Sequence, residues 1–217
     1  MVSVDTYRSF ADLAAREREG EDYRITVLYR PSSGIAVIAP HGGLIEPRTG
    51  EIARAIAGEE FNLYLFEGIK PSGNRTLHIT SHRFDERSCL ALLRGCSHVV
   101  AVHGYTGYDE AVLVGGLDVD LKASITESLR HAGFKVQIDG HRFQAVEPTN
   151  VCNRCRTGRG AQLEISRYIR GGRKESEFIQ AVRTALLLYN EVLPVAPRHG
   201  CVTSRKKASA GRDNPTS

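Results

Sequence analysis

The 217-residue sequence contains no apolar stretch that approaches the roughly 20 residues a helix needs to span a bilayer, so we expect no membrane segment. Residues 1–5 do not combine a basic region with an apolar one, which argues against a secretory signal. We therefore expect synthesis in the cytosol, with any extracellular action following cell lysis. The GxxxxGK[ST] phosphate loop, the GxSxG elbow and the HExxH helix are also missing. Their absence argues against an NTPase, a serine hydrolase and a zincin protease.

The chain has few cysteines for its length, and their odd number does not suit a disulfide framework. Cys152 and Cys155 form a CxxC pair. A zinc ribbon needs a second pair, and Cys89, Cys96 and Cys201 do not supply one at suitable spacing. We therefore expect reduced, partly buried thiols in a loop.

The net charge of +4 belongs to the C-terminal end of the chain. Residues 198–217 carry five basic side chains against one acidic side chain, so residues 1–197 are neutral as a whole. We expect this basic tail, which is rich in polar and small residues, to be disordered. It lacks the interleaved aromatic side chains that stack on bases, so we do not expect a nucleic-acid partner.

Short apolar runs alternate with amphipathic segments, which predicts a single α/β domain over residues 1–197. We expect a mixed, mostly parallel sheet flanked by helices. The expected strands are 24–29, 34–39, 61–66, 77–80, 98–103, 111–114, 134–138 and 162–165. The expected helices are 6–18, 49–57, 85–94, 119–132 and 175–192. Thr49 is expected to cap the second of these helices and Asp85 the third.

Two of the apolar runs end in a histidine that is followed by glycine. Residues 35–40 lead into His41, and residues 98–102 lead into His103. In a parallel sheet, ligands collect in the crevice at the carboxyl ends of the strands. Glu46 follows soon after His41, and two imidazoles with one carboxylate match the three-ligand set of a catalytic zinc, whose fourth position stays open for water. The pattern therefore predicts a metal-dependent hydrolase.

The spacing of His41 and Glu46 does not place them as neatly on one helix face as a separation of three or four residues would. Gly42 and Gly43 give the backbone the freedom to bring both side chains together in a tight turn. An ordinary histidine and a surface glutamate in a turn are the alternative. His103, at the end of another buried strand, favours the metal site.

Glu164 lies in a short, otherwise apolar strand at 162–165. If Leu163 faces one side of the sheet, Gln162 and Glu164 share the other. Burial would raise the pKa of this carboxyl group, which suits a general base near neutral pH. The alternative is an edge strand with a solvated glutamate.

Arginines crowd both sides of that strand. Arg154 and Arg159 lie in a glycine-containing loop before it, and Arg167 and Arg170 follow it. Guanidinium groups bind carboxylates bidentately, so Arg154 and Arg159 are our candidates for binding an acidic substrate. His82 is a further candidate for lining the same crevice. The same density of arginines would also suit phosphate or nucleic acid.

Seven short segments carry a family resemblance: EDYRI at 21–25, HGGLIE at 41–46, AIAG at 55–58, YLFEG at 64–68, LHITS at 77–81, VHG at 102–104 and QLEIS at 162–166. Together they resemble the poly-γ-glutamate hydrolase family of phages and bacilli, enzymes with a zinc-carboxypeptidase-like fold. The resemblance covers most of residues 6–192.

The resemblance implies that zinc is held by His41, Glu46 and His103, with Glu164 as the general base. It also implies cleavage of γ-glutamyl amide bonds inside poly-γ-glutamate, an anionic capsule polymer that a phage must breach. We expect the enzyme to act as a monomer. Two alternatives stay open: a metal-dependent amidohydrolase of a small N-acyl amino acid, and a nucleic-acid-binding accessory protein that uses the arginine loop and the basic tail.

Overall fold

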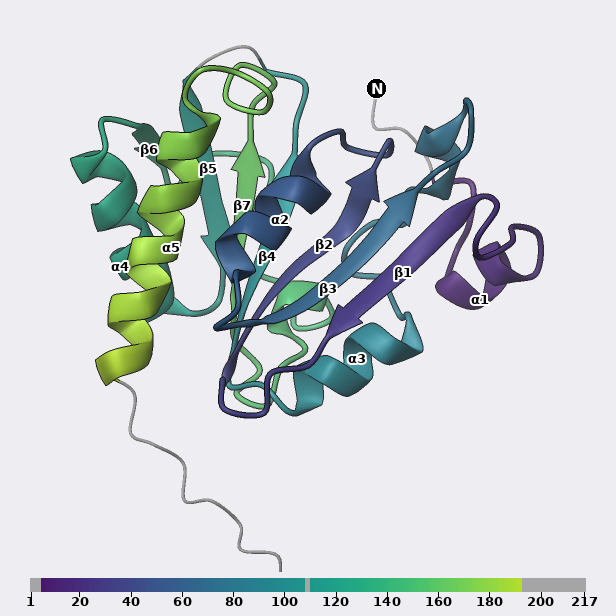
Figure 1. The fold of residues 1–217 in the computed structure, drawn as a ribbon, viewed down its shortest axis with the longest axis horizontal. Helices are drawn as coiled ribbons and strands as arrows, with labels where there is room; N and C mark the ends of the chain where they lie inside the picture. The colour runs from purple at the N-terminus through teal and green to yellow at the C-terminus, as the bar shows by residue number, and fades with distance from the viewer. Residues whose placement is uncertain (1–4, 108–109, 193–217) are drawn as a thin grey trace, which may run out of the picture.

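The computed structural model describes residues 5–107 and 110–192, which form one sheet with helices on both faces (Figure 1). The basic tail expected at 198–217 lies outside the described residues. Among the residues that are described, no helix has the length and apolarity needed to cross a membrane.

The sheet has seven strands in the order β1-β3-β2-β4-β7-β5-β6. Their bounds are β1 (Tyr23–Leu28), β2 (Ile35–Gly43), β3 (Asn62–Gly68), β4 (His98–Gly104), β5 (Ala111–Gly116), β6 (Lys135–Gln137) and β7 (Ala161–Ile165). The central strands β3, β2, β4 and β7 run parallel to one another. Strand β1 is antiparallel to β3, β5 is antiparallel to β7, and β6 is parallel to β5. The prediction of an α/β domain with a mixed, mostly parallel sheet is confirmed.

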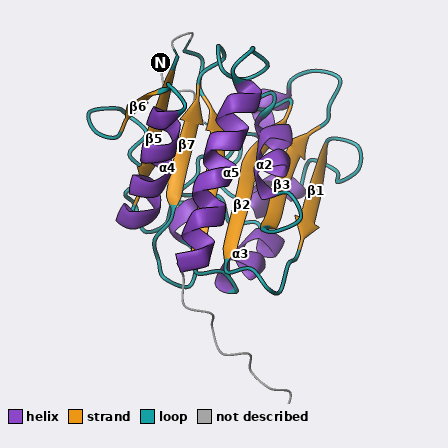
Figure 2. Ribbon diagram, turned by 60° about the vertical axis from the view of Figure 1, so that its left-hand side comes forward, coloured by secondary structure: helices purple, strands orange, loops and turns teal. Residues whose placement is uncertain are grey.

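Helices cover both faces of this sheet. They are α1 (Phe10–Ala14), α2 (Thr49–Ala57), α3 (Arg87–Arg94), α4 (Val119–His131) and α5 (Glu175–Val192). Helices α2, α4 and α5 lie on one face, as Figure 2 shows, and α3 lies on the other. Because both faces are covered, the central strands are apolar along nearly their whole length rather than alternating with polar residues.

The predicted strand at 77–80 is wrong. Asn74–Leu77 form a 3₁₀ turn, and residues 78–80 belong to no strand. The side chain of Asn74 accepts a hydrogen bond from the amide of Lys70 and donates one to its carbonyl oxygen, which closes the loop. Leu77 and Ile79 are buried in the core on the α3 face. Apolar alternation therefore reflects burial in this segment, without sheet pairing.

Both predicted helix caps are also wrong. Thr49 is the first residue of α2, and its hydroxyl donates to the carbonyl oxygens of His41 and Glu46 instead. Glu86 rather than Asp85 caps α3, because its longer side chain reaches back to accept from two backbone amides of the first turn.

The described cysteines are free and buried, as the sequence predicts for reduced thiols. Cys152 lies in the 3₁₀ turn Val151–Asn153, and Cys155 follows in the loop before β7. Burial raises the pKa of the Cys152 thiol, which keeps this thiol protonated and unreactive near neutral pH.

Candidate metal centre and active site

A one-residue bulge in β2 decides where His41 points. Along β2, Ala39 packs on the α2 face of the sheet and Ile38 on the α3 face. Strict alternation would place His41 on the same side as Ala39. The pairing of β2 with β3 shifts between Ala39 and Gly42, which adds one residue to β2. The ring of His41 therefore lies on the α3 side, near Phe84. Bulges commonly re-aim a side chain beside a functional site.

The turn after β2 folds Glu46 back toward His41. The amide of Glu46 donates to the carbonyl oxygen of His41 at 2.9 Å. Gly43 has a φ of +62°, and a Cβ there would collide with the carbonyl oxygen of Gly68, so the turn requires glycine at this position. Nδ1 of His41 and Oε1 of Glu46 are 3.2 Å apart. The two side chains converge, as the sequence predicts.

His103, on β4, brings a second imidazole next to His41 and Glu46. Its Nδ1 lies 3.1 Å from Nδ1 of His41 and 3.7 Å from Oε2 of Glu46. Ligand atoms bound at about 2.0–2.1 Å around a tetrahedral zinc are about 3.3 Å from one another. The chemistry and spacing of this donor set therefore fit a zinc ion.

Hydrogen bonds to the backbone fix the orientation of the predicted ligands His41 and Glu46. Nε2 of His41 lies 2.8 Å from the carbonyl oxygen of Ile79. Because a carbonyl oxygen only accepts, Nε2 carries the proton and Nδ1 keeps its lone pair for a metal. Oε2 of Glu46 accepts from the amide of Gly104 at 2.8 Å. Outer contacts of this kind hold metal ligands in place before the metal binds.

His78 is a neighbour of the centre that the sequence did not single out. Its ring stacks on that of His41 with 4.1 Å between centroids. Ligand atoms of His41, Glu46 and His78 all lie within 4.8 Å of one another. The nearby His41, and then burial, lower the pKa of His78. Its Nδ1 is bound to Oδ1 of Asp5 at 2.8 Å, so His78 packs beside the predicted ligands with one nitrogen already engaged.

Glu164 is on β7 and is paired in register with His103 on β4, so it lies next to the predicted ligands. Leu163 packs in the core on the α2 face, while Gln162 and Glu164 line the cavity on the other face. Nε2 of Gln162 donates to Oε1 of Glu164 at 3.0 Å. Burial, and then the negative charge of Glu46, raise the pKa of Glu164 well above its ordinary value. A raised pKa suits a group that takes up and returns a proton near neutral pH.

These side chains line a cavity of about 670 Å³ at the carboxyl ends of β2, β4 and β7. His82 lines the cavity as an exposed residue, in agreement with its predicted position. Arg75, Arg142, Arg167 and Arg170 add positive charge to its wall.

The structure does not bring Arg154 and Arg159 to this cavity. Both are exposed, and neither lines it. Their loop contacts the amino end of β4, where the thiol of Cys155 donates to the carbonyl oxygen of Ser97. Since β7 runs parallel to β4, the loop before β7 lies at the opposite end of the sheet from the predicted ligands. Their position does not support the predicted role in substrate binding at this cavity, whereas Arg167 and Arg170, which follow β7, line it.

The fold and this cavity define the class as an α/β protein with a candidate metal centre at the carboxyl ends of its parallel strands. The family model for poly-gamma-glutamate hydrolase matches residues 7–180. The chain therefore belongs to the poly-γ-glutamate hydrolase family.

Relatives of known sequence and structure agree with this assignment. The chain is 37% identical to Bacillus subtilis (strain 168) protein YndL over 193 residues, which cover 88% of this chain and 74% of YndL. Its structure is similar to that of a bacteriophage poly-gamma-glutamate hydrolase, with a TM-score of 0.83, 33% identity, and coverage of 88% of this chain and all of the other. A zinc-free structure of YndL gives a TM-score of 0.78 and 34% identity over 88% of this chain and all of YndL in that structure.

Proposed function

We propose that this hydrolase is zinc-dependent and cleaves γ-glutamyl amide bonds inside poly-γ-glutamate. The observation that carries the proposal is the convergence of His41, Glu46 and His103 beside the buried carboxyl group of Glu164. Family membership supports the polymer as substrate, and the existence of a form of YndL described as zinc-free supports zinc as the metal.

His41 and His103, each through Nδ1, and Glu46, through its carboxylate, would hold the zinc. When bound, zinc supplies Lewis acidity, which activates a water molecule and polarises the scissile carbonyl group. Glu164 accepts the proton of the attacking water on its carboxylate and then returns it to the leaving nitrogen. Gln162 donates to Oε1 of Glu164, which leaves Oε2 to take the proton.

The positive wall of the cavity suits this polymer, because every γ-linked residue carries a free α-carboxylate. Arg75, Arg142 and Arg167 come from three separate loops and are exposed at the cavity. Among the described residues, none of the three forms an ion pair with an acidic side chain, so their guanidinium groups are available to bind carboxylates bidentately. We propose that they replace Arg154 and Arg159 as the substrate-binding arginines, with His82 beside them.

The similarity to a bacteriophage enzyme favours a phage origin for this chain. In that setting the enzyme would reach a capsule polymer after release by host lysis, and we propose that it acts there as a monomer.

The test is to incubate the purified protein with high-molecular-weight poly-γ-glutamate, with and without a chelator, and to follow chain length by gel filtration. The proposal expects a rapid fall in chain length that the chelator stops and added zinc restores. If the polymer is unchanged although zinc is bound, poly-γ-glutamate is not the substrate, and small N-acyl amino acids are then assayed as substrates. Cleavage that continues at the same rate in the presence of the chelator would contradict the proposed requirement for a metal.

A further inference from the structure

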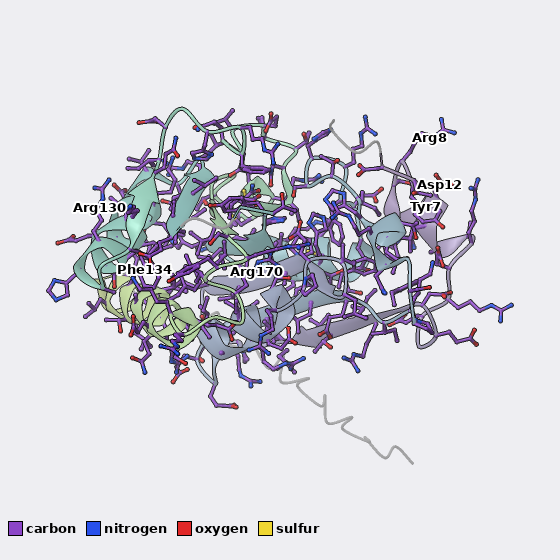
Figure 3. The ribbon with its side chains drawn as sticks, turned by 90° about the horizontal axis from the view of Figure 1, so that it is seen from above. Tyr7, Arg8, Asp12, Arg130, Phe134 and Arg170 are labelled. Carbon is purple, nitrogen blue, oxygen red and sulfur yellow. The ribbon has the colours of Figure 1, made fainter. Side chains whose placement is uncertain are left out.

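Arg170 is an arginine with an unusual set of partners. It is only 9% exposed and lies just after β7. Its guanidinium group donates to three backbone carbonyl oxygens: Nε to Ile165 at 3.0 Å, Nη1 to Pro47 at 2.6 Å and Nη2 to Tyr105 at 3.0 Å. Figure 3 labels Arg170 near the middle of the molecule, seen from above.

The three acceptors come from three different segments of the site: the turn after β2, the residue that follows β4 and the last residue of β7. Pro47 directly follows the proposed ligand Glu46, and Tyr105 lies two residues after the proposed ligand His103. Ile165 directly follows the proposed general base. One side chain therefore bonds the backbone beside two proposed ligands and beside the base.

Gly104 makes room for this guanidinium group. A Cβ at Gly104 would lie 2.5 Å from Nη1 and 2.6 Å from Nε of Arg170, which is closer than such atoms approach in proteins. The φ of Gly104 is not in the left-handed region, so alanine could adopt the backbone conformation. The close approach of Arg170 is therefore what calls for glycine here.

Only arginine can make this set of bonds. Its planar fork carries five N–H donors that point in fixed and different directions, whereas lysine carries its donors on a single nitrogen. A lysine at 170 would keep the positive charge but would reach fewer of the three carbonyl groups.

We propose that Arg170 is a positioning residue that fixes three backbone segments of the metal centre relative to one another, an inference that rests on the zinc function proposed above. It acts through the backbone beside Glu46, His103 and Glu164 rather than by touching the metal.

The experiment measures the zinc dissociation constant by competition with a chromophoric chelator, together with thermal unfolding of the zinc-free protein. Arg170→Lys removes the guanidinium group. Gly104→Ala keeps the arginine but displaces its guanidinium group. Contacts behind metal ligands typically contribute about 10- to 100-fold to metal affinity, so each variant is expected to bind zinc at least about tenfold more weakly. Arg183→Lys is the matched control, since Nη1 of Arg183 also donates to a backbone carbonyl oxygen, that of Ile56, away from the cavity.

A double variant separates this role from a general effect on folding. If Gly104→Ala acts by displacing the guanidinium group, it costs little further zinc affinity on the Arg170→Lys background, because contacting residues are not additive. Wild-type zinc affinity in Gly104→Ala, or full additivity of the two changes, would overturn the proposal. If Arg170→Lys does not fold, Gly104→Ala alone decides. Failure of the parent chain to bind zinc would instead reject the proposed function.

Discussion

Two arginine-bearing segments flank strand β7, and the difference between them decides which one belongs to the site. Arg154 and Arg159 precede the strand, and Arg167 and Arg170 follow it. In composition they look alike. In the structure the first pair is exposed at the amino end of the parallel strands, while the second pair lines the cavity at the carboxyl end.

The two histidines of β4, at opposite ends of the strand, differ in the same way. His98, where β4 begins, pairs with Asp118 and packs on Tyr189, so its contacts are with other parts of the fold. His103, near the end of β4, lies beside His41 and Glu46 at the cavity. The amino end of the sheet serves stability, and the carboxyl end holds the candidate chemistry, as in other sheets with parallel strands.

The largest expected effect is a loss of kcat, caused by a substitution at the carboxyl ends of the parallel strands. Glu164→Gln keeps the shape and hydrogen-bonding capacity of the side chain but removes the proton acceptor. General acid–base catalysis contributes about 10²- to 10⁴-fold, so kcat on poly-γ-glutamate is expected to fall by that factor while zinc content stays normal. Glu147→Gln, an exposed change at the same cavity, is the control and is expected to keep wild-type kcat. A fully active Glu164→Gln enzyme would rule out Glu164 as the base.

Removing single positive charges before and after β7 tests directly which arginines bind the substrate. Arg142→Gln or Arg167→Gln is expected to raise KM for the polymer by about tenfold, equivalent to about 1.4 kcal/mol, because each loses a charged hydrogen bond to a carboxylate. Arg154→Gln and Arg159→Gln are expected to leave KM unchanged. Steady-state kinetics at fixed ionic strength provide the measurement. The opposite pattern would return substrate binding to the loop before β7.

The smallest effect is expected at the amino end, and on stability alone. Oδ1 of Asp118 caps α4 by accepting from the amide of Leu121, and its Oδ2 binds Nδ1 of His98 at 2.8 Å. Asp118→Ala is expected to lower the free energy of unfolding by about 1 kcal/mol near pH 7 without changing kcat. Denaturant titration of both proteins, with activity measured alongside, provides the check.

The cost of Asp118→Ala should also depend on pH. Burial raises the pKa of Asp118, but the bonds from His98 and Leu121 outweigh this, so its pKa in the folded protein lies below the ordinary 3.8. A depressed carboxyl pKa contributes stability that is complete above the unfolded value and is lost as pH falls through the folded value. The difference between the two proteins is therefore expected to shrink below about pH 4. A difference that grows on acidification would contradict this assignment.

Much of the fold followed from local patterns in the sequence. The predicted helices at 49–57 and 175–192 match α2 and α5, because their amphipathic faces and flanking breakers are local signals. Buried strands that end in histidine also placed His41 and His103 at one edge of a parallel sheet, where their rings lie 4.9 Å apart.

What the sequence did not reveal depends on contacts between distant segments. The bulge that turns His41 toward the α3 face arises from pairing with β3, which no pattern within β2 encodes. His78 stacks on His41 from a segment whose alternation resembled a strand. Arg170 reaches three carbonyl oxygens in three separate segments of the chain, and only the assembled sheet brings these segments together.

If His41, Glu46 and His103 hold one zinc ion, the zinc content of matched variants after dialysis will reveal it. His103→Ala is compared with His82→Ala, which removes an exposed histidine from the same cavity. We predict one zinc per chain in the parent protein and in His82→Ala, and loss of tightly bound zinc in His103→Ala. Full zinc occupancy in His103→Ala, with unchanged affinity, would contradict it.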